Sequence, residues 1–134
     1  MTKLKELHII IAEDDSDDRE IIMDSFANHT AFIRVDIVKN GRELLKFLQD
    51  GHPKPDVILT DINMPIMDGI EALTEIHNDP LLFHIPAFVY STTINPTYQA
   101  KCMELGTKGF LIKPISLKGF GEIPHKIVDI LTES

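Results

Sequence analysis

Short runs of apolar residues alternate along this chain with segments in which apolar residues recur at helical spacing. Five runs predict strands, at residues 8–12, 32–38, 57–59, 87–90 and 109–112. The first and third are continuous, which is typical of strands buried on both faces. The second alternates, with Ile33, Val35 and Ile37 on one side, and therefore predicts a half-buried strand at a sheet edge.

Helices are predicted after each of these strands. Ser16 is expected to cap the first helix, and the acidic residues that follow suit its first turn. The last segment contains Gly119, Gly121 and Pro124, so only its second half, beginning near Pro124, is expected to be helical. The other helices are predicted around residues 44–48 with an end at Asp50-Gly51, at residues 70–77, and from Asn95-Pro96 to Gly106.

This fivefold repetition of strand and helix predicts an α/β fold. Such a pattern gives a parallel sheet with helices on both faces and right-handed crossovers. The length of 134 residues, with 43% hydrophobic and 25% charged residues, suits one domain spanning residues 1–134. Because the chain ends after the fifth predicted helix, we expect no effector domain.

The net charge and the cysteine content indicate which partners the protein can bind directly and which cellular compartment suits it. A net charge of -8 argues against nucleic acid or an anionic membrane as the direct partner, since both need basic patches. Cys102 is the single cysteine, which excludes an internal disulfide and suits a reducing compartment. The sequence contains neither a signal peptide nor an apolar stretch of membrane-spanning length. We therefore expect a cytoplasmic location.

Polar residues stand where four of the predicted strands end. Glu13 and Asp14 follow the first strand, Asp61 the third, Ser91 the fourth and Lys113 the fifth. In a parallel sheet all these ends lie at one edge, where three carboxylates would repel one another. Mg²⁺ binds carboxylate oxygens and would relieve this repulsion. A metal ion and a lysine beside an aspartate predict a site at which Asp61 accepts a phosphoryl group as an acyl phosphate.

Taken in order, these motifs resemble the receiver domain of two-component response regulators, in particular the stand-alone, chemotaxis-response-regulator-like form. The resemblance covers nearly the whole chain and implies a flavodoxin-like (βα)5 sheet of strand order 2-1-3-4-5. The long segment 78–86 also resembles that of receivers paired with phytochrome-type kinases. The motifs that carry the resemblance are Glu13-Asp14, Asp61, Met64-Pro65, Asp68-Gly69, Ser91 and Lys113-Pro114.

The resemblance implies a role for each site residue. Mg²⁺ (or Mn²⁺) would be held by the carboxylates of Asp14 and Asp61 and the backbone carbonyl of Asn63, with Glu13 acting largely through water. Lys113 would hold the phosphoryl oxygens, and its bond to Pro114 is expected to be cis. Ser91 would move to the phosphoryl group and leave space for Phe110 to rotate.

The resemblance also implies the partners. The phosphoryl donor would be a sensor histidine kinase or a histidine phosphotransfer protein. An unidentified downstream protein would bind the switched surface, and homodimerisation is a further option in this family.

Three other classes of protein use parts of the same pattern. A haloacid dehalogenase-type phosphatase also has an aspartate nucleophile and Mg²⁺, but it needs a second aspartate where this chain has Asn63. A pseudo-receiver would act only by binding partners, although it would have little reason to keep the complete polar set. A flavodoxin would need a phosphate-binding first loop, whereas this loop is acidic. Asp15, Asp17 and Asp18 are interpreted as solvated charges at a helix start.

Overall fold

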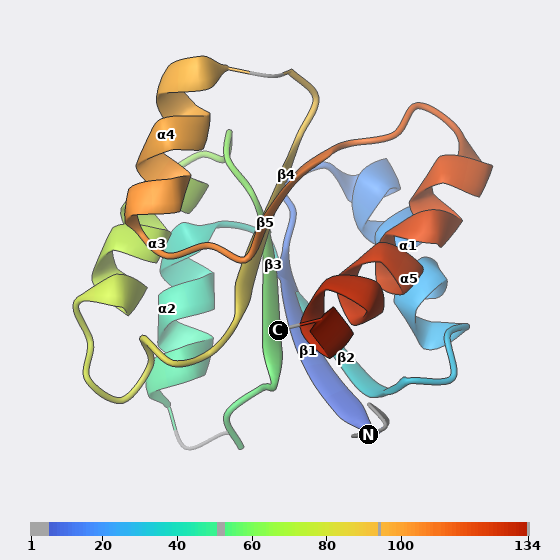
Figure 1. The fold of residues 1–134 in the computed structure, drawn as a ribbon, viewed down its shortest axis with the longest axis horizontal. Coiled ribbons are helices and arrows are strands. Elements are labelled where there is room, and N and C mark those ends of the chain that lie inside the picture. The colour runs from blue at the N-terminus through green and yellow to red at the C-terminus, as the bar shows by residue number, and fades with distance from the viewer. Residues whose placement is uncertain (1–5, 51–52, 94, 134) are drawn as a thin grey trace.

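Five parallel strands form one sheet in the computed structural model, which describes residues 6–50, 53–93 and 95–133. The strand order is β2-β1-β3-β4-β5, so the predicted order and the edge position of β2 are confirmed (Figure 1). The strands are β1 (Leu7–Ala12), β2 (Phe32–Val38), β3 (Val57–Asp61), β4 (Ala87–Ser91) and β5 (Gly109–Ile112). The helices are α1 (Ser16–Ala27), α2 (Gly41–Gln49), α3 (Gly69–His77), α4 (Pro96–Glu104) and α5 (Leu117–Glu133).

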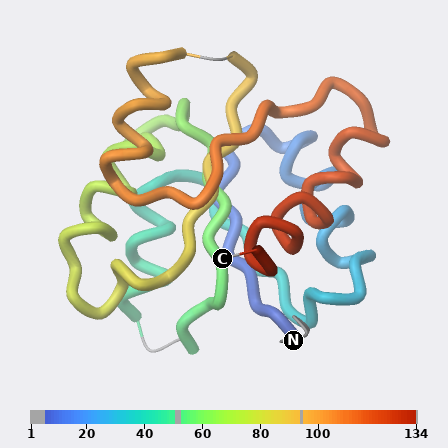
Figure 2. Tube along the Cα trace, viewed as in Figure 1, coloured from blue at the N-terminus to red at the C-terminus, as the bar shows by residue number. Residues whose placement is uncertain are grey.

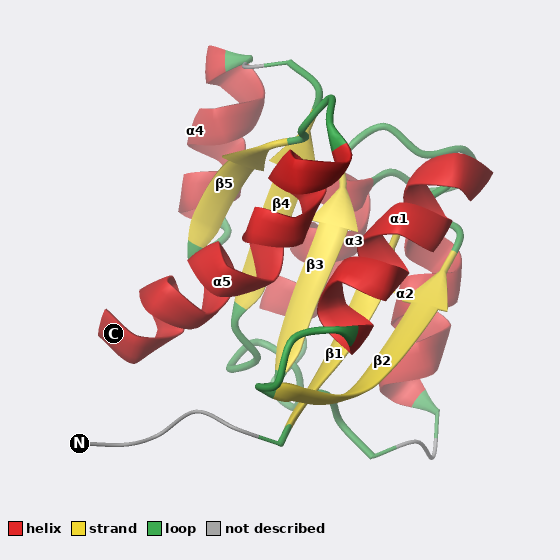
Figure 3. Ribbon diagram, turned by 90° about the vertical axis from the view of Figure 1, so that its right-hand side faces the viewer, coloured by secondary structure: helices red, strands yellow, loops and turns green. Residues whose placement is uncertain are grey.

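Helices cover both faces of the sheet. Helices α2, α3 and α4 lie on one face, while α1 and α5 pack side by side on the other (Figures 1 and 2). Figure 3 shows the strands running in the same direction, so that their carboxyl ends share one edge. Residues of β1, β3 and β4 alternate between two buried apolar clusters, one under each helical layer. The burial of these strands on both faces explains their nearly continuous apolar sequences.

Strand β2 departs from the regular alternation predicted for it. Its pairing with β1 shifts register, from Leu7 opposite Phe32 to His8 opposite Arg34, which leaves Ile33 without a partner position. Ile33 is 70% exposed, whereas Val35 and Ile37 pack into the cluster under α1 and α5. The prediction for Ile33 was therefore wrong, because an extra residue in an edge strand can bulge out of the ladder.

Helix α5 is longer than the sequence predicted. It begins at Leu117, so Pro124 lies inside the helix and not near its start. An interior proline costs about 3 kcal/mol. Phe120, Ile123 and Ile127 are all buried in the core, however, and each fully buried side chain of this size contributes about 1.5–3 kcal/mol. Packing against α1 and the sheet therefore outweighs the local preference against a helix.

Side chains cap the helix starts that lead away from the site. The N-cap of α1 is Asp15, which accepts a hydrogen bond from the Asp18 backbone, and not Ser16 as predicted. Asp68 forms a capping box with Glu71 at α3, and Asn95 caps α4. The predicted end of α2 at Asp50 is confirmed, while Gly51 lies outside the described residues. Within the described part of the chain, no helix is long and apolar enough to cross a membrane.

Candidate functional site

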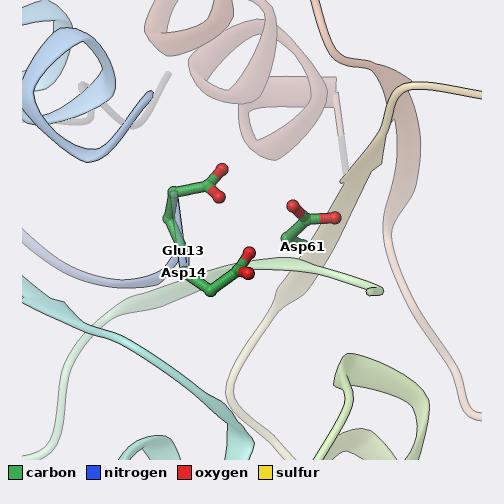
Figure 4. Close-up of side chains that lie close together, drawn as sticks. All are labelled: Glu13, Asp14 and Asp61. Carbon is green, nitrogen blue, oxygen red and sulfur yellow. The ribbon is translucent and has the colours of Figure 1, made fainter. Parts of the chain in front are cut away.

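Three carboxylates gather at the carboxyl edge of the sheet (Figure 4). Glu13 and Asp14 follow β1, and Asp61 is the last residue of β3. One oxygen of each lies within 4.8 Å of the other two. Glu13 and Asp61 are buried, whereas Asp14 is exposed. The structure thus brings these predicted residues together, with Asp14 on the solvent side.

Lys113, just beyond β5, provides a positive charge in direct contact with carboxylates of the cluster. Its Nζ lies 2.7 Å from Glu13 Oε1 and 2.8 Å from Asp61 Oδ2, and the side chain is almost completely buried. Burial alone would lower the pKa of Lys113, but hydrogen bonds to Asp61 and Glu13 outweigh burial and raise this pKa. Lys113 is therefore a permanent cation, fixed against the candidate phosphoryl acceptor.

The carboxylate of Asp61 is held at both oxygens. Oδ1 accepts a hydrogen bond from the Ile62 backbone at 2.7 Å, and Oδ2 accepts one from Lys113. Burial raises the pKa of Asp61 above its ordinary value, and the Lys113 hydrogen bond and charge offset only part of this increase. The nearby charge of Glu13 raises the pKa further. The anionic, nucleophilic form of Asp61 would therefore gain from additional positive charge at this edge.

Asp18 belongs to this cluster, contrary to its interpretation as a solvated helix-start charge. It lies in the first turn of α1, and its Oδ2 is 3.1 Å from Lys113 Nζ. Its side chain is 28% exposed, so it stands at the outer side of the buried pair of acids. Nothing in the local sequence separates Asp18 from Asp17, because the contact depends on where the packing of α1 places its first turn relative to Lys113.

Tyr90 is a second residue that sequence reasoning missed. It is fully buried in β4, and its hydroxyl donates a hydrogen bond to Glu13 Oε1 at 2.5 Å. Lys113 Nζ lies 5.0 Å from the centre of the Tyr90 ring, a cation–π distance. Burial and the neighbouring Glu13 raise the pKa of Tyr90, so the phenol stays protonated and remains a donor. A tyrosine near the end of an otherwise apolar strand was the available signal.

Ser91 and Phe110 lie on the other face of the sheet. Ser91 alternates with Tyr90 at the end of β4 and therefore shares the face of Val89, which is paired with Phe110. Ser91 is 2% exposed, and Phe110 packs, partly buried, against the cluster under α2, α3 and α4. Their proximity agrees with a coupled pair, while the switching role itself stays a prediction.

The loop between β3 and α3 is built tightly against Asp61. Gly69 donates a backbone hydrogen bond to the Ile62 carbonyl at 2.8 Å. A Cβ on Gly69 would lie 2.1 Å from the Asp61 carbonyl oxygen, so this position has no room for a side chain. Ile66 has a φ of 71°, and the Met67 backbone N–H donates to the Pro65 carbonyl across it. A β-branched residue at positive φ is strained, and here the strain lies in the loop that follows the acceptor.

The bond between Lys113 and Pro114 is not cis as expected. No cis peptide bond is present among the described residues, which include both partners. The trans isomer is favoured at such bonds by about 0.5–1 kcal/mol. Lys113 still reaches the acids through its side chain, and its backbone N–H donates to the Ser91 carbonyl at 2.8 Å.

The residues of this edge fit a hard divalent cation. Glu13, Asp14 and Asp61 offer only oxygen, the ligand that Mg²⁺ and Mn²⁺ prefer. Asp14 is open to solvent, and the exposed Asn63 lies two residues after Asp61 in the adjacent loop. Lys113 neutralises part of the acidic charge, which leaves an excess of negative charge for an ion to balance.

Comparison with known proteins agrees with this geometry. The phosphorylated cyanobacterial phytochrome response regulator RcpA superposes with a TM-score of 0.86 at 32% identity, covering 96% of both chains. The Mn²⁺-bound form of response regulator Rcp1 gives a TM-score of 0.82 at 28% identity, again covering 96% of both. The two-component response regulator ORR8 of Oryza sativa subsp. indica is 30% identical over 110 residues, 82% of this chain and 88% of that protein.

These similarities favour the receiver over the phosphatase and the flavodoxin. They also support the resemblance to phytochrome-associated receivers, since RcpA is named as a phytochrome response regulator. The family model of the response regulator receiver domain matches residues 9–123, which include every residue of the acidic cluster and Lys113. The chain therefore belongs to the receiver domain family of two-component response regulators.

Proposed function

We propose that Asp61 accepts a phosphoryl group from a phosphohistidine in a Mg²⁺-dependent reaction. A carboxylate oxygen of Asp61 forms the new P–O bond, and the P–N bond to the histidine breaks. The electron pair of that bond returns to the imidazole nitrogen, which takes up a proton. The observation that carries the proposal is the burial of Asp61 between Lys113 and two further acids.

The residues of the chain supply position and charge. Lys113 already contacts Asp61 Oδ2, so its ammonium lies where the oxygens of an incoming phosphoryl group would be placed. When bound, Mg²⁺ would supply further positive charge to those oxygens, held by Asp14, Asp61 and the Asn63 carbonyl. Ile62 fixes the orientation of Asp61 through its backbone N–H. The chain would thus catalyse only its own phosphorylation and dephosphorylation.

Receiver domains of response regulators take phosphoryl groups from histidine kinases. For this chain we infer that the donor is a sensor histidine kinase or a phosphotransfer protein. The similarity to RcpA makes a phytochrome-type kinase the first donor to test. The phosphorylated form would then bind a downstream protein through the surface around Phe110.

The decisive test is phosphorylation of Asp61. Acetyl phosphate with Mg²⁺ should add one phosphoryl group, detected by intact-mass spectrometry, and EDTA should prevent it. Asp61→Asn should abolish the adduct, because an amide is not a comparable nucleophile. Asp129→Asn, an exposed control on α5, should be modified like the wild type. A stable adduct on Asp61→Asn would refute Asp61 as the acceptor. No adduct on the wild type would refute the proposal and leave the pseudo-receiver.

Ser91→Ala tests the proposed switch. The variant should still take up phosphate, because the hydrogen bonds to the Asp61 carboxylate come from Ile62 and Lys113. The Ser91 carbonyl, which accepts from the Lys113 backbone, is kept in the variant. The response at Phe110 should weaken, since the hydroxyl that would move to the phosphoryl group is missing. NMR shifts of Phe110 with and without beryllofluoride measure this response. Equal shifts in variant and wild type would show that Ser91 does not couple the two sites.

A further inference from the structure

The hydroxyl of Tyr90 has no role in packing the core. Phe88 lies two residues earlier on the same face of β4, is equally buried, and fills the same apolar cluster without a polar atom. The Tyr90 hydroxyl instead extends to the carboxyl edge of the sheet, where it contacts Glu13 at 2.5 Å. A buried hydroxyl is costly unless it has a partner, so the contact explains why tyrosine is tolerated here.

The carboxylate of Glu13 is fully engaged within the protein. Its Oε1 accepts a hydrogen bond from Tyr90 and forms an ion pair with Lys113 at 2.7 Å, and its Oε2 accepts from the Asp15 backbone at 3.1 Å. The residue is 0% exposed. Such a carboxylate is held in one orientation, whereas the neighbouring Asp14 is exposed and free to face solvent.

The length of the side chain at position 13 matters for this arrangement. An aspartate there would place its carboxylate about 1.5 Å closer to the backbone, the length of one C–C bond. A hydrogen bond of 2.5 Å would then stretch beyond the usual range. Glu13 and Tyr90 therefore act as a matched pair.

We propose that Tyr90 is a positioning residue of the site, whose hydroxyl holds the Glu13 carboxylate on the Lys113 ammonium and thereby keeps it away from the metal ion. The inference rests on the proposed function of this edge as a metal-assisted phosphoryl-acceptor site. It assigns direct ligation to Asp14 and Asp61, and it makes Glu13 a partner of Lys113.

Tyr90→Phe tests this inference with Mg²⁺ alone, by isothermal titration calorimetry. Loss of the hydroxyl frees Glu13 to turn toward the ion, so Mg²⁺ should bind about three- to ten-fold more tightly. This gain in affinity corresponds to part of the free energy of one hydrogen bond to a charged group. Tyr98→Phe, on the exposed face of α4, should bind like the wild type. Tyr90→Phe should add nothing in a Glu13→Asp background. Unchanged or weaker Mg²⁺ binding in a folded Tyr90→Phe variant would overturn the inference.

A measurement that leaves Tyr90 in place covers the case in which Tyr90→Phe does not fold. The chain has two tyrosines, so ¹³Cζ-tyrosine labelling gives two NMR signals. Glu13→Asp should shift the Tyr90 signal, because its hydrogen bond is lost, and leave Tyr98 unchanged. Saturating Mg²⁺ should not reproduce this shift in the wild type. If it does, the ion takes Glu13 from Tyr90, and the inference is wrong.

The two proposals fail separately. Phosphorylation of the wild type with normal Mg²⁺ binding in Tyr90→Phe would refute the role of Tyr90 alone. Tighter Mg²⁺ binding in Tyr90→Phe without any phosphoryl adduct on the wild type would refute Asp61 as acceptor, while the positioning of Glu13 by Tyr90 would stand.

Discussion

Replacing Lys113 with methionine should lower the free energy of unfolding by about 3–5 kcal/mol at neutral pH, the usual cost of removing one partner from a buried ion pair. Methionine keeps most of the side-chain volume but leaves Glu13 and Asp61 buried without their cation. With a typical total stability of about 5–15 kcal/mol, a loss of this size is readily measured by urea denaturation. Phosphorylation should be lost as well.

The pH dependence of the Lys113→Met variant distinguishes charge from packing. Burial already raises the pKa of Asp61, and without Lys113 the hydrogen bond and the charge that lower it most are lost, which leaves only the smaller effect of the Ile62 backbone hydrogen bond. A carboxyl group whose pKa is raised on folding favours the folded state below its unfolded pKa, and this stability is lost as the pH rises through the folded pKa. The free energy of unfolding of Lys113→Met should therefore fall furthest below that of wild type at neutral pH, and the difference should shrink toward pH 4. A difference that does not vary with pH would show that the stability is lost through packing and not through charge.

Two comparisons complete this prediction. Mg²⁺ should stabilise Lys113→Met more than wild type, because the ion replaces part of the missing positive charge. Lys101→Met, in an exposed pair with Glu104 at 3.8 Å, should change the free energy of unfolding by less than about 0.5 kcal/mol. An unfolding midpoint of Lys113→Met equal to that of wild type at neutral pH would contradict the arrangement of charges described here.

Gly69→Ala should destabilise the protein by at least about 2 kcal/mol, although helix propensity alone favours alanine over glycine by about 1 kcal/mol. Gly69 is the first residue of α3, and a Cβ there would lie 2.1 Å from the Asp61 carbonyl oxygen. The clash involves backbone on both sides, so the loop must move as a whole. Since that loop leads from Asp61, Mg²⁺ affinity should fall together with stability.

Gly121→Ala provides the matched control for this substitution. Gly121 lies in the interior of α5, and a Cβ there would meet no atom within 4 Å. The higher helix propensity of alanine should then determine the change in stability, and the free energy of unfolding of the variant should exceed that of wild type by about 0.5–1 kcal/mol. Opposite signs for the two variants in thermal unfolding support the close approach at Gly69. Stabilisation by Gly69→Ala would show that the loop between β3 and α3 has room that the structure does not give it.

The local spacing of apolar residues was sufficient to predict most of the strands and helices of the fold. The apolar runs of β1 and β3 identified buried strands, because both of their faces are covered by helices. Periodicity failed at Ile33, where the register shifts, and at the start of α5, where Phe120 and Ile123 are held by the core despite Pro124. In both places a contact between distant segments outweighed the local preference.

The apolar runs alone were enough to place Glu13, Asp14, Asp61 and Lys113 at strand ends, and parallel strands then require these ends to share an edge. The side chains that complete the cluster could be identified only from the packing of the folded chain. Asp18 depends on the placement of α1 against Lys113, 95 positions away, and Tyr90 reaches Glu13 across 77 positions. Periodicity records which face of an element is buried, whereas the pairing of individual side chains is set by the packing of whole elements.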